Sequence, residues 1–266
     1  MTADTAKYTH GYHPTVLAGH QLRNVENSAK YLEPHLKRDM RLLDVGSGAG
    51  TITCDFTNFV GSVAALEVSE EAIGITRAEA EKHGVPLEYA VGSALAIPFP
   101  DASFDVVHAH QVLQHVGDPI QALREMNRVL KPGGLVAARE TDFPSFTWYP
   151  EDKALDEWRD MYLKIARSNG GDPAAGRKLL AWALAAGLTN ITPGAQMWCY
   201  ATPETRESWG GLWTPRILQP PFAEQAYAQG YSHSDMETFA DALTRWKNDP
   251  AGWFLAPSAY ILAQKE

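Results

Sequence analysis

The sequence is poor in cysteine and in positive charge. Only two cysteines occur among 266 residues, Cys54 and Cys199, and neither has a C-x-x-C partner. This count excludes a disulfide framework and a zinc knuckle, and it favours a reducing compartment. The 23 Lys and Arg against 32 Asp and Glu give a net charge of −9. Proteins that bind nucleic acid or anionic lipid usually carry the opposite sign.

The sequence also lacks a long apolar stretch. No run of 18 apolar residues occurs, so no membrane-spanning helix is predicted. The first twenty residues have no basic segment followed by an apolar one, which is the pattern of a secretory signal. We therefore expect a cytoplasmic protein whose partner is a small molecule rather than nucleic acid or a membrane. The sequence gives no indication of the oligomeric state.

Residues 41–140 alternate short apolar runs with helix-like segments, which is typical of βαβ units around a parallel sheet. The predicted strands are residues 41–45, 62–66, 87–91, 104–109 and 134–140. The predicted helices between them are residues 69–84 and 118–134. In the second helix Asp118 is placed as the cap and Pro119 at the first helical position, and the glycines at 133 and 134 end it.

The alternation of short strands and helices ends near residue 150, and longer helices are predicted after it. Helices are predicted over residues 151–171 and 172–187, the second with Asp172 and Pro173 at its start. A strand over 190–202, a stretch of helix and loop, and a last strand over 256–266 follow. All eight tryptophans lie at or beyond position 148. The simplest architecture is one α/β domain.

A glycine-rich turn follows the first predicted strand. Gly46, Gly48 and Gly50 permit positive φ and allow a ligand close to the backbone, and the next helix offers unpaired N–H groups. A dinucleotide fingerprint needs a small residue at the next position, where this chain has Thr51. The spacing therefore disfavours an NAD-linked oxidoreductase.

Two acidic residues accompany this turn. Asp44 would repel a pyrophosphate but could accept a hydrogen bond from an ammonium group. Glu67, at the end of the next predicted strand, could accept from both hydroxyls of a ribose. The pair fits an adenosine joined to an amino acid better than it fits NAD. A tight turn without any cofactor is the alternative at this point.

Five segments, in this order, resemble the class I S-adenosylmethionine-dependent methyltransferases. They are LLDVGSGAG, ALEVS, VGSALAIPFPDASFDVV, HQVLQHVGDP and LKPGG, within residues 40–140. The resemblance is to the small-molecule branch related to ubiquinone/menaquinone-biosynthesis enzymes. It implies a Rossmann-like, mostly parallel sheet of seven strands with an antiparallel last strand and helices on both faces.

The resemblance also implies how the chain is organised. Residues 1–38 would form an N-terminal lid, with a helix expected over 21–36. Residues 39–266 would form the methyltransferase domain, and residues 203–252 a helical cap inserted into it. The N-terminal segment would close over the cofactor.

The cofactor implied by the resemblance is S-adenosylmethionine, which leaves as S-adenosylhomocysteine, and no metal is expected. The implied cofactor-binding residues are Asp44, Gly46, Ser47, Gly48, Gly50, Glu67, Val68, Ser93, Ala94 and Gln111. Glu67 would hold the ribose and Val68 would flank the adenine. Ser93 stands where the family commonly has an aspartate, so a neutral hydroxyl would meet the adenine amino group.

Methyl transfer from a sulfonium needs little covalent chemistry from the protein. Positioning of the acceptor can contribute about 7 to 11 kcal/mol in favourable cases, whereas a general base adds roughly 10² to 10⁴ in rate. His115 and His110 are the candidate bases, because histidine titrates near neutral pH. A structural hydrogen bond is the alternative role for His115.

The acceptor is expected to be a small, apolar or aromatic organic molecule. The candidate substrate-binding residues are Tyr12, His13, His20, Trp148, Tyr200 and Trp213. Aromatic side chains suit such a pocket, although packing of the cap onto the sheet is the alternative for each of them. The methylated atom, O, C or N, is left open. So are two other functions, a cofactor sensor and an enzyme that uses the sulfonium electrostatically in a cyclisation or rearrangement.

Overall fold

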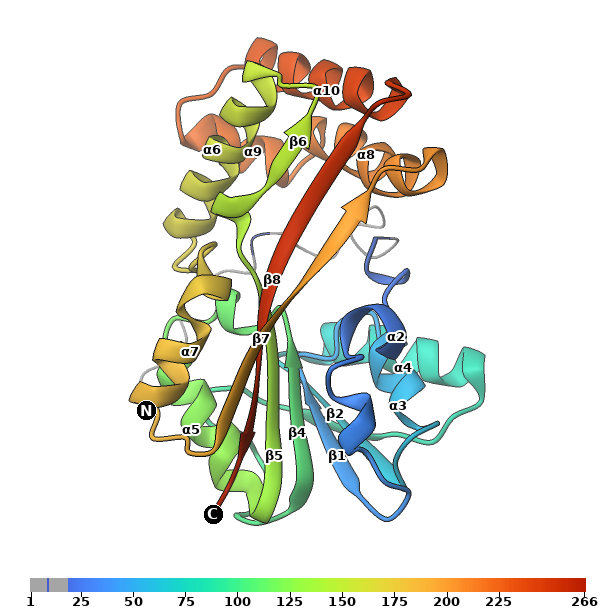
Figure 1. Cartoon of the computed structure of the whole chain (residues 1–266), viewed down its shortest axis with the longest axis vertical. Coiled ribbons are helices and arrows are strands. Elements are labelled where there is room, and N and C mark those ends of the chain that lie inside the picture. Colours follow the sequence, from blue (N-terminus) through green and yellow to red (C-terminus); the bar gives the residue numbers. More distant parts are fainter. Residues whose placement is uncertain (1–8, 10–18) are drawn as a thin grey trace.

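One twisted sheet runs through the whole molecule (Figure 1). The computed structural model describes residue 9 and residues 19–266. Its strands are β1 Arg41–Val45, β2 Ser62–Glu67, β3 Glu88–Val91, β4 Phe104–His110, β5 Leu130–Thr141, β6 Thr147–Tyr149, β7 Ile191–Tyr200 and β8 Trp253–Gln264. They pair in the order β3-β2-β1-β4-β5-β8-β6, and β7 also pairs with β8.

The first five strands are parallel, and the last strand, β8, is antiparallel to β5, β6 and β7. This confirms the mostly parallel Rossmann-like sheet with an antiparallel last strand. The described part of the chain has eight strands in this sheet rather than seven. The extra strand is β6, which pairs with residues 253–255 of β8, beyond the point where β5 stops pairing at Ser258.

Helices cover both faces of the parallel part, as expected. The described helices are α2 Val25–Ser28, α3 Thr51–Phe56, α4 Glu70–His83, α5 Pro119–Val129, α6 Lys153–Ser168, α7 Ala175–Ala185, α8 Pro203–Leu218, α9 Phe222–Ala228 and α10 His233–Asn248. Short 3₁₀ turns are η1 Glu33–His35, η2 Leu113–His115 and η3 Phe143–Ser145. Apolar side chains of α5 and α7 pack on one face of the sheet, and those of α2 and α3 pack on the other.

Local signals set several helix ends. The Asp118 carboxylate accepts from the Gln121 N–H at 2.9 Å, and Pro119 takes the first helical position, as predicted. The prediction for α7 was wrong in detail, because this helix begins at Ala175. The Asp172 carboxylate accepts from the Ala174 N–H in the turn before the helix and pairs with Lys178.

The helix expected over residues 21–36 is largely absent. Only α2 and η1 form there, because Asn24 and Asn27 cap each other's backbone N–H and the chain leaves helical geometry at Ala29. Pro34 has no N–H to continue a helix and disfavours helical geometry in the residue before it. The role of residues 1–38 as a lid stays a prediction.

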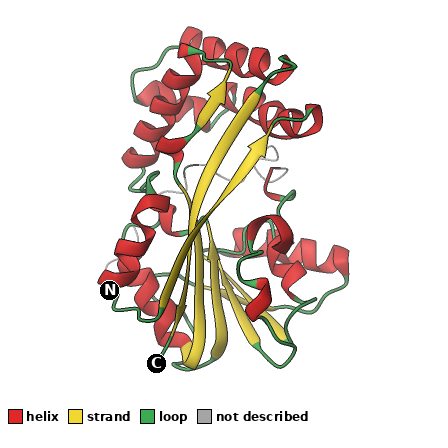
Figure 2. Cartoon of the chain, viewed as in Figure 1, coloured by secondary structure: helices red, strands yellow, loops and turns green. Residues whose placement is uncertain are grey.

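Helices α6, α8, α9 and α10 form an upper layer around the ends of β7 and β8 (Figure 2). Their aromatic side chains interlock. Trp158 meets Trp213 at 5.1 Å between ring centroids, and Trp209 meets Phe254 at 4.0 Å. We call this upper layer the aromatic cap. It comprises α6, α8, α9, α10 and the buried residues of their shared apolar cluster.

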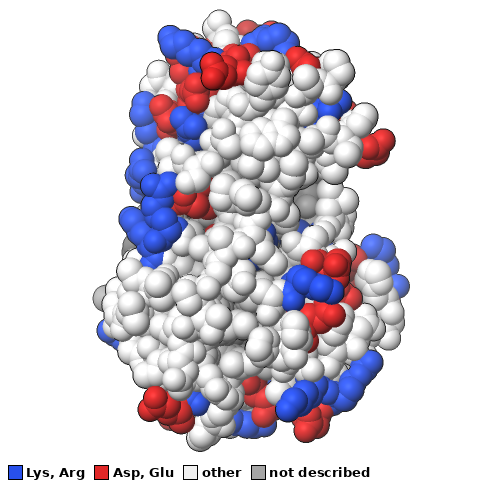
Figure 3. Space-filling model, viewed as in Figure 1, with Lys and Arg blue, Asp and Glu red and all other residues white. Residues whose placement is uncertain are grey.

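Charged side chains gather at the ends and flanks of the face seen in Figure 3, and the middle, over β7 and β8, carries few of them. Within the described residues, no helix has both the length and the apolar content that a bilayer crossing requires.

Candidate functional site

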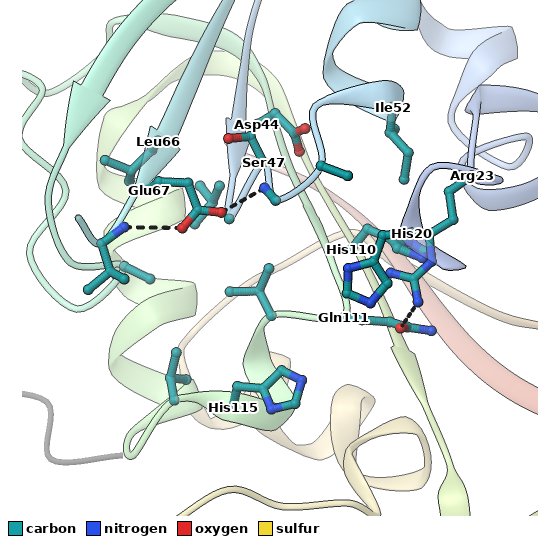
Figure 4. A pocket seen from close by; sticks show the side chains of 18 of the residues that line it. His20, Arg23, Asp44, Ser47, Ile52, Leu66, Glu67, His110, Gln111 and His115 are labelled. Atoms are coloured by element: carbon teal, nitrogen blue, oxygen red, sulfur yellow. Dashed lines mark hydrogen bonds between the residues drawn. The ribbon is translucent and has the colours of Figure 1, made fainter. Parts of the chain in front are cut away.

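A cavity of about 220 Å³ opens at the carboxyl ends of β1, β2 and β4. Ligands of open α/β sheets bind at this edge. Its lining residues are His20, Arg23, Asp44, Val45, Gly46, Ser47, Gly48, Ala49, Thr51, Ile52, Leu66, Glu67, Val68, Gly92, Ser93, Ala94, His110, Gln111, Val112, His115 and Val116. Figure 4 shows two ends. Asp44 and Glu67 lie at one, and His20, Arg23, His110 and Gln111 lie at the other.

The glycine turn is shaped by close contacts. Gly46 has φ +70°, and a Cβ there would lie 2.5 Å from a methyl carbon of Val112. Its N–H donates to the Leu66 carbonyl at 2.8 Å, which holds the turn against β2. Gly50 has φ +81°, and its absent Cβ would lie 3.0 Å from the Thr76 Cα on α4. Gly46 and Gly48 therefore line the cavity, whereas Gly50 packs away from it against α4.

Glu67 lies at the end of β2 with its carboxylate folded onto the turn. Oε1 accepts from the Gly48 N–H at 2.6 Å, and Oε2 accepts from the Val68 N–H at 3.2 Å. Burial raises the pKa of Glu67, while these two N–H donors act in the opposite direction. Each carboxylate oxygen has a second acceptor position, so the side chain can still receive two hydroxyl groups.

Asp44 lines the cavity from the end of β1 but is also held from behind. The Thr53 hydroxyl donates to Oδ2 at 2.5 Å, and His108 Nδ1 lies 2.7 Å from Oδ1. The side chains of Thr53 and His108 are fully buried. These contacts fix the carboxylate in one orientation and leave lone pairs for a further donor.

The residues that the resemblance places beside the adenine lie together near Glu67. Val68, Ser93 and Ala94 all line the cavity, and Val68 is 64% exposed. The Ser93 hydroxyl accepts from the Leu95 N–H at 3.1 Å, which fixes its place in the turn.

Gln111 connects the other end of the cavity to the N-terminal segment. It has φ +58°, a conformation that is uncommon for a residue with a side chain. Its Oε1 accepts from Arg23 at 2.8 Å, and its Nε2 donates to the Thr141 hydroxyl at 2.5 Å. Arg23 was not predicted from the sequence. A single arginine in a segment without a recognisable motif does not indicate a binding role from the sequence alone.

Three histidines face this end of the cavity, and all are held neutral. Burial lowers the pKa of His115 to about 3, and the Arg23 charge acts in the same direction. Burial also lowers the pKa of His20 and His110 well below the usual range, with Arg139 adding to the effect at His110. His115 Nε2 lies 3.1 Å from Gln114 Nε2. A histidine whose conjugate acid has such a low pKa is a weak base.

The aromatic substrate candidates do not reach the cavity. Trp148 and Trp213 are buried in the aromatic cap, and Tyr200 packs against the same cluster. Their rings contact other aromatic rings of that cluster: Trp148 and Tyr200 meet Phe254, and Trp213 meets Trp158. Tyr12 and His13 lie outside the described residues, while His20 does line the cavity. Among described residues no group of three His, Cys, Asp or Glu side chains could hold a metal ion.

Comparison with known proteins identifies the family of the chain. The methyltransferase domain family matches residues 43–138. The chain is 34% identical over 274 residues to an uncharacterized methyltransferase of Schizosaccharomyces pombe, covering 99% of this chain and 98% of the relative. It belongs to the S-adenosylmethionine-dependent methyltransferases.

This methyltransferase also resembles the ubiquinone/menaquinone biosynthesis C-methyltransferase of Cronobacter sakazakii. They are 34% identical over 128 residues, 46% of this chain and 50% of that protein. The solved structure of the YcgJ protein of Bacillus subtilis superimposes with a TM-score of 0.61 at 20% identity, covering 93% of this chain and 99% of that one. This confirms the family predicted from the sequence, and the superposition shows a shared fold.

Proposed function

We propose that this methyltransferase moves a methyl group from S-adenosylmethionine to a small organic acceptor in the cavity between the glycine turn and Gln111. The observation that carries the proposal is the division of the cavity into two ends. The carboxylates of Asp44 and Glu67 lie at one end, and Arg23 with three neutral histidines lies at the other. A cofactor with hydroxyl and ammonium donors suits the first end.

The residues present fit S-adenosylmethionine. Glu67 would accept from the two ribose hydroxyls and Asp44 from the ammonium group. Arg23, a described cation on the lining, would donate to the carboxylate of the methionine part. The absent Cβ of Gly48 would have only the Gly46 carbonyl oxygen near it, at 3.9 Å, so the turn leaves open space beside the cavity. When bound, the cofactor supplies an electrophilic methyl group on a sulfonium.

The chain's own contribution is to position the acceptor and to exclude water. The Arg23 to Gln111 hydrogen bond fastens the segment before α2 to the loop after β4. The Trp198 indole N–H donates to the Asn27 carbonyl at 2.9 Å, which fastens α2 to β7. We propose that the contact between Arg23 and Gln111, which both line the cavity, closes one side of it. Positioning of this kind can supply more of the rate than a weak base does.

His110 and His115 stay candidates for proton acceptance, with a limit set by their surroundings. Both rings lie on the cavity lining, and both are neutral at pH 7. A neutral imidazole can take a proton at a ring nitrogen, but a conjugate-acid pKa far below the ordinary value gives it little driving force. We propose that these rings orient the acceptor more than they deprotonate it.

Mass balance tests the proposed function. The protein is incubated with S-adenosylmethionine and a panel of phenols, enols, carboxylic acids and amines, and product and cofactor are quantified by mass spectrometry. Methyl transfer must add 14 mass units to one acceptor and release an equal amount of S-adenosylhomocysteine. A converted acceptor of unchanged mass with intact cofactor would instead favour a cyclisation or rearrangement. Cofactor binding without any conversion would favour a sensor.

A further inference from the structure

A fully buried arginine on β5 has no hydrogen-bond partner within the described part of the chain. Arg139 is 0% exposed, and all three of its guanidinium nitrogens lack an acceptor there. Native proteins rarely leave buried polar groups unsatisfied, and an unpaired buried charge is especially unfavourable. Burial lowers the pKa of Arg139 only to about 10, so the group stays charged at neutral pH.

Two other buried side chains near Arg139 also have polar atoms without a hydrogen-bond partner among the described residues. Both ring nitrogens of His110 and the Tyr31 hydroxyl are buried and have no partner among the residues described. His110 lies directly opposite Arg139 in the β4–β5 pair. Tyr260 lies opposite Arg139 on the other side, and its ring stacks on Tyr31 at 4.3 Å. The three incomplete groups therefore share one region of one sheet face.

The neighbouring groups pack against Arg139 but supply no hydrogen-bond acceptor for its charged guanidinium. Its guanidinium lies 4.4 Å from the centroid of the Trp198 ring, a cation–π contact that accepts no N–H hydrogen bond. The adjacent Glu140 projects from the opposite face of the strand, because side chains alternate. Its carboxylate already accepts from three backbone N–H groups at the start of η2, those of Val112, Leu113 and Gln114.

This region adjoins the acceptor end of the cavity. His110 is on the cavity lining, and so is Arg23, whose guanidinium lies 5.4 Å from the same Trp198 ring. His110 is held neutral and supplies no charge. Arg23 is assigned to the carboxylate of the cofactor, so Arg139 is the positive charge that stays uncompensated at this end when the cofactor is bound, whereas the carboxylates of Asp44 and Glu67 lie at the other end.

We infer that the methyl acceptor is an organic anion, a carboxylate, phenolate or enolate, whose charged oxygen is held at His110 in the positive field of Arg139. This inference rests on the proposed function and specifies the substrate class of the same cavity. A negatively charged oxygen would accept from a ring N–H of His110 and offset the Arg139 charge, since electrostatic attraction is strong where water is excluded. An uncharged acceptor would leave that charge uncompensated.

Benzoate and its uncharged analogue benzamide test the inference. Each is titrated by calorimetry into the full-length protein saturated with S-adenosylhomocysteine. We expect benzoate to bind at least tenfold more tightly than benzamide. Arg139→Gln should weaken benzoate binding at least tenfold and leave benzamide binding unchanged, while Arg139→Lys should retain part of the preference. Unchanged S-adenosylhomocysteine affinity shows that each variant keeps its cofactor site.

Arg216→Gln is the matched control. Arg216 is also a buried arginine over an indole, 4.1 Å from the Trp213 ring, but it lies in the aromatic cap. Its loss should change neither affinity by more than twofold. If Arg139→Gln does not fold, Tyr31→Phe and His110→Gln replace it, and each should reduce the benzoate preference at least threefold.

Equal affinity of the wild-type protein for benzoate and benzamide would overturn the inference. So would an unchanged preference in Arg139→Gln, or a crystal structure of the ternary complex with only water at the Arg139 and His110 nitrogens. Methyl transfer to neutral acceptors alone would overturn the inference and leave the proposed function standing. A benzoate preference without methyl transfer to any acceptor would overturn the proposed function and leave the anion site standing.

Discussion

The glycine turn and the aromatic cap are both largely buried, but they use burial differently. In the cap, large rings fill the space between helices, and Trp213 contacts Trp158, Tyr162 and Phe222. At the turn, residues without bulk allow β1, α4 and the loop after β4 to approach one another and still leave a cavity. Aromatic residues therefore fill the core of the cap, and small residues line the candidate binding cavity.

The largest effect should come from the cap and should concern stability alone. Trp213→Ala removes a buried ring, which typically lowers the free energy of unfolding by about 3 to 5 kcal/mol. Urea unfolding followed by circular dichroism measures this change. The affinity of the folded variant for S-adenosylhomocysteine should stay within twofold. A stable variant that no longer binds the cofactor would show that the cap is part of the binding site, and would contradict the assignment of the cap to stability alone.

The next effect should come from the turn and should concern binding. Gly46→Ala puts a Cβ where Val112 already lies and holds alanine at φ +70°. Relief of the close contact must move Val112, which also lines the cavity. If the bound geometry restores strain of about 1 to 3 kcal/mol, S-adenosylhomocysteine affinity should fall roughly thirtyfold in calorimetry.

Gly133→Ala is the control for the turn, because it has φ +80° and nothing within 4 Å of the added carbon. It should lower stability slightly and leave affinity unchanged. Equal binding losses in Gly46→Ala and Gly133→Ala would show that the close contact at the turn is irrelevant to binding.

A smaller loss is expected at the acidic end of the cavity. Glu67→Gln removes the charge that would strengthen hydrogen bonds to a ribose, a loss of about 1 to 3 kcal/mol in binding. Calorimetry should therefore show at least fivefold weaker binding of S-adenosylhomocysteine. Glu88→Gln, on the neighbouring strand, pairs with Arg41 outside the cavity and should bind normally. Unaltered affinity in Glu67→Gln would remove this residue from the site.

The smallest effect is a pH dependence of stability. The folded protein holds His115 with a pKa of about 3, below the ordinary value of 6.5. The unfolded chain therefore binds a proton first, and the stability contribution present above pH 6.5 is lost as the pH falls. The free energy of unfolding should fall by about 1 kcal/mol less in His115→Gln than in wild type between pH 6.5 and 5.5. Parallel losses in both proteins would contradict the neutral state of His115 in the folded protein.

The parallel sheet and the glycine turn could be predicted because their signals are local. Alternating apolar runs and helix caps such as Asp118 set β1 to β5 and α5. The spacing from Gly46 to Glu67 also reflects one turn, one helix and one strand, and both residues do line the cavity. Their roles toward the cofactor stay predictions.

The remaining features depend on contacts between distant segments. The pairing of Arg139 with His110 across β4 and β5 is a matter of register that no local pattern contains. Arg23 reaches Gln111 across 88 positions of sequence. The aromatic residues of the cap gave a strong compositional signal, but composition does not say whether rings line a pocket or fill a core.

A crystal structure with S-adenosylhomocysteine tests the central claim most directly. The account predicts the ribose hydroxyls on the Glu67 carboxylate, the amino-acid end between Asp44 and Arg23, and no contact with Trp213. A ligand seated among the cap aromatics, or one in the cavity with Glu67 still bonded only to Gly48 and Val68, would contradict it.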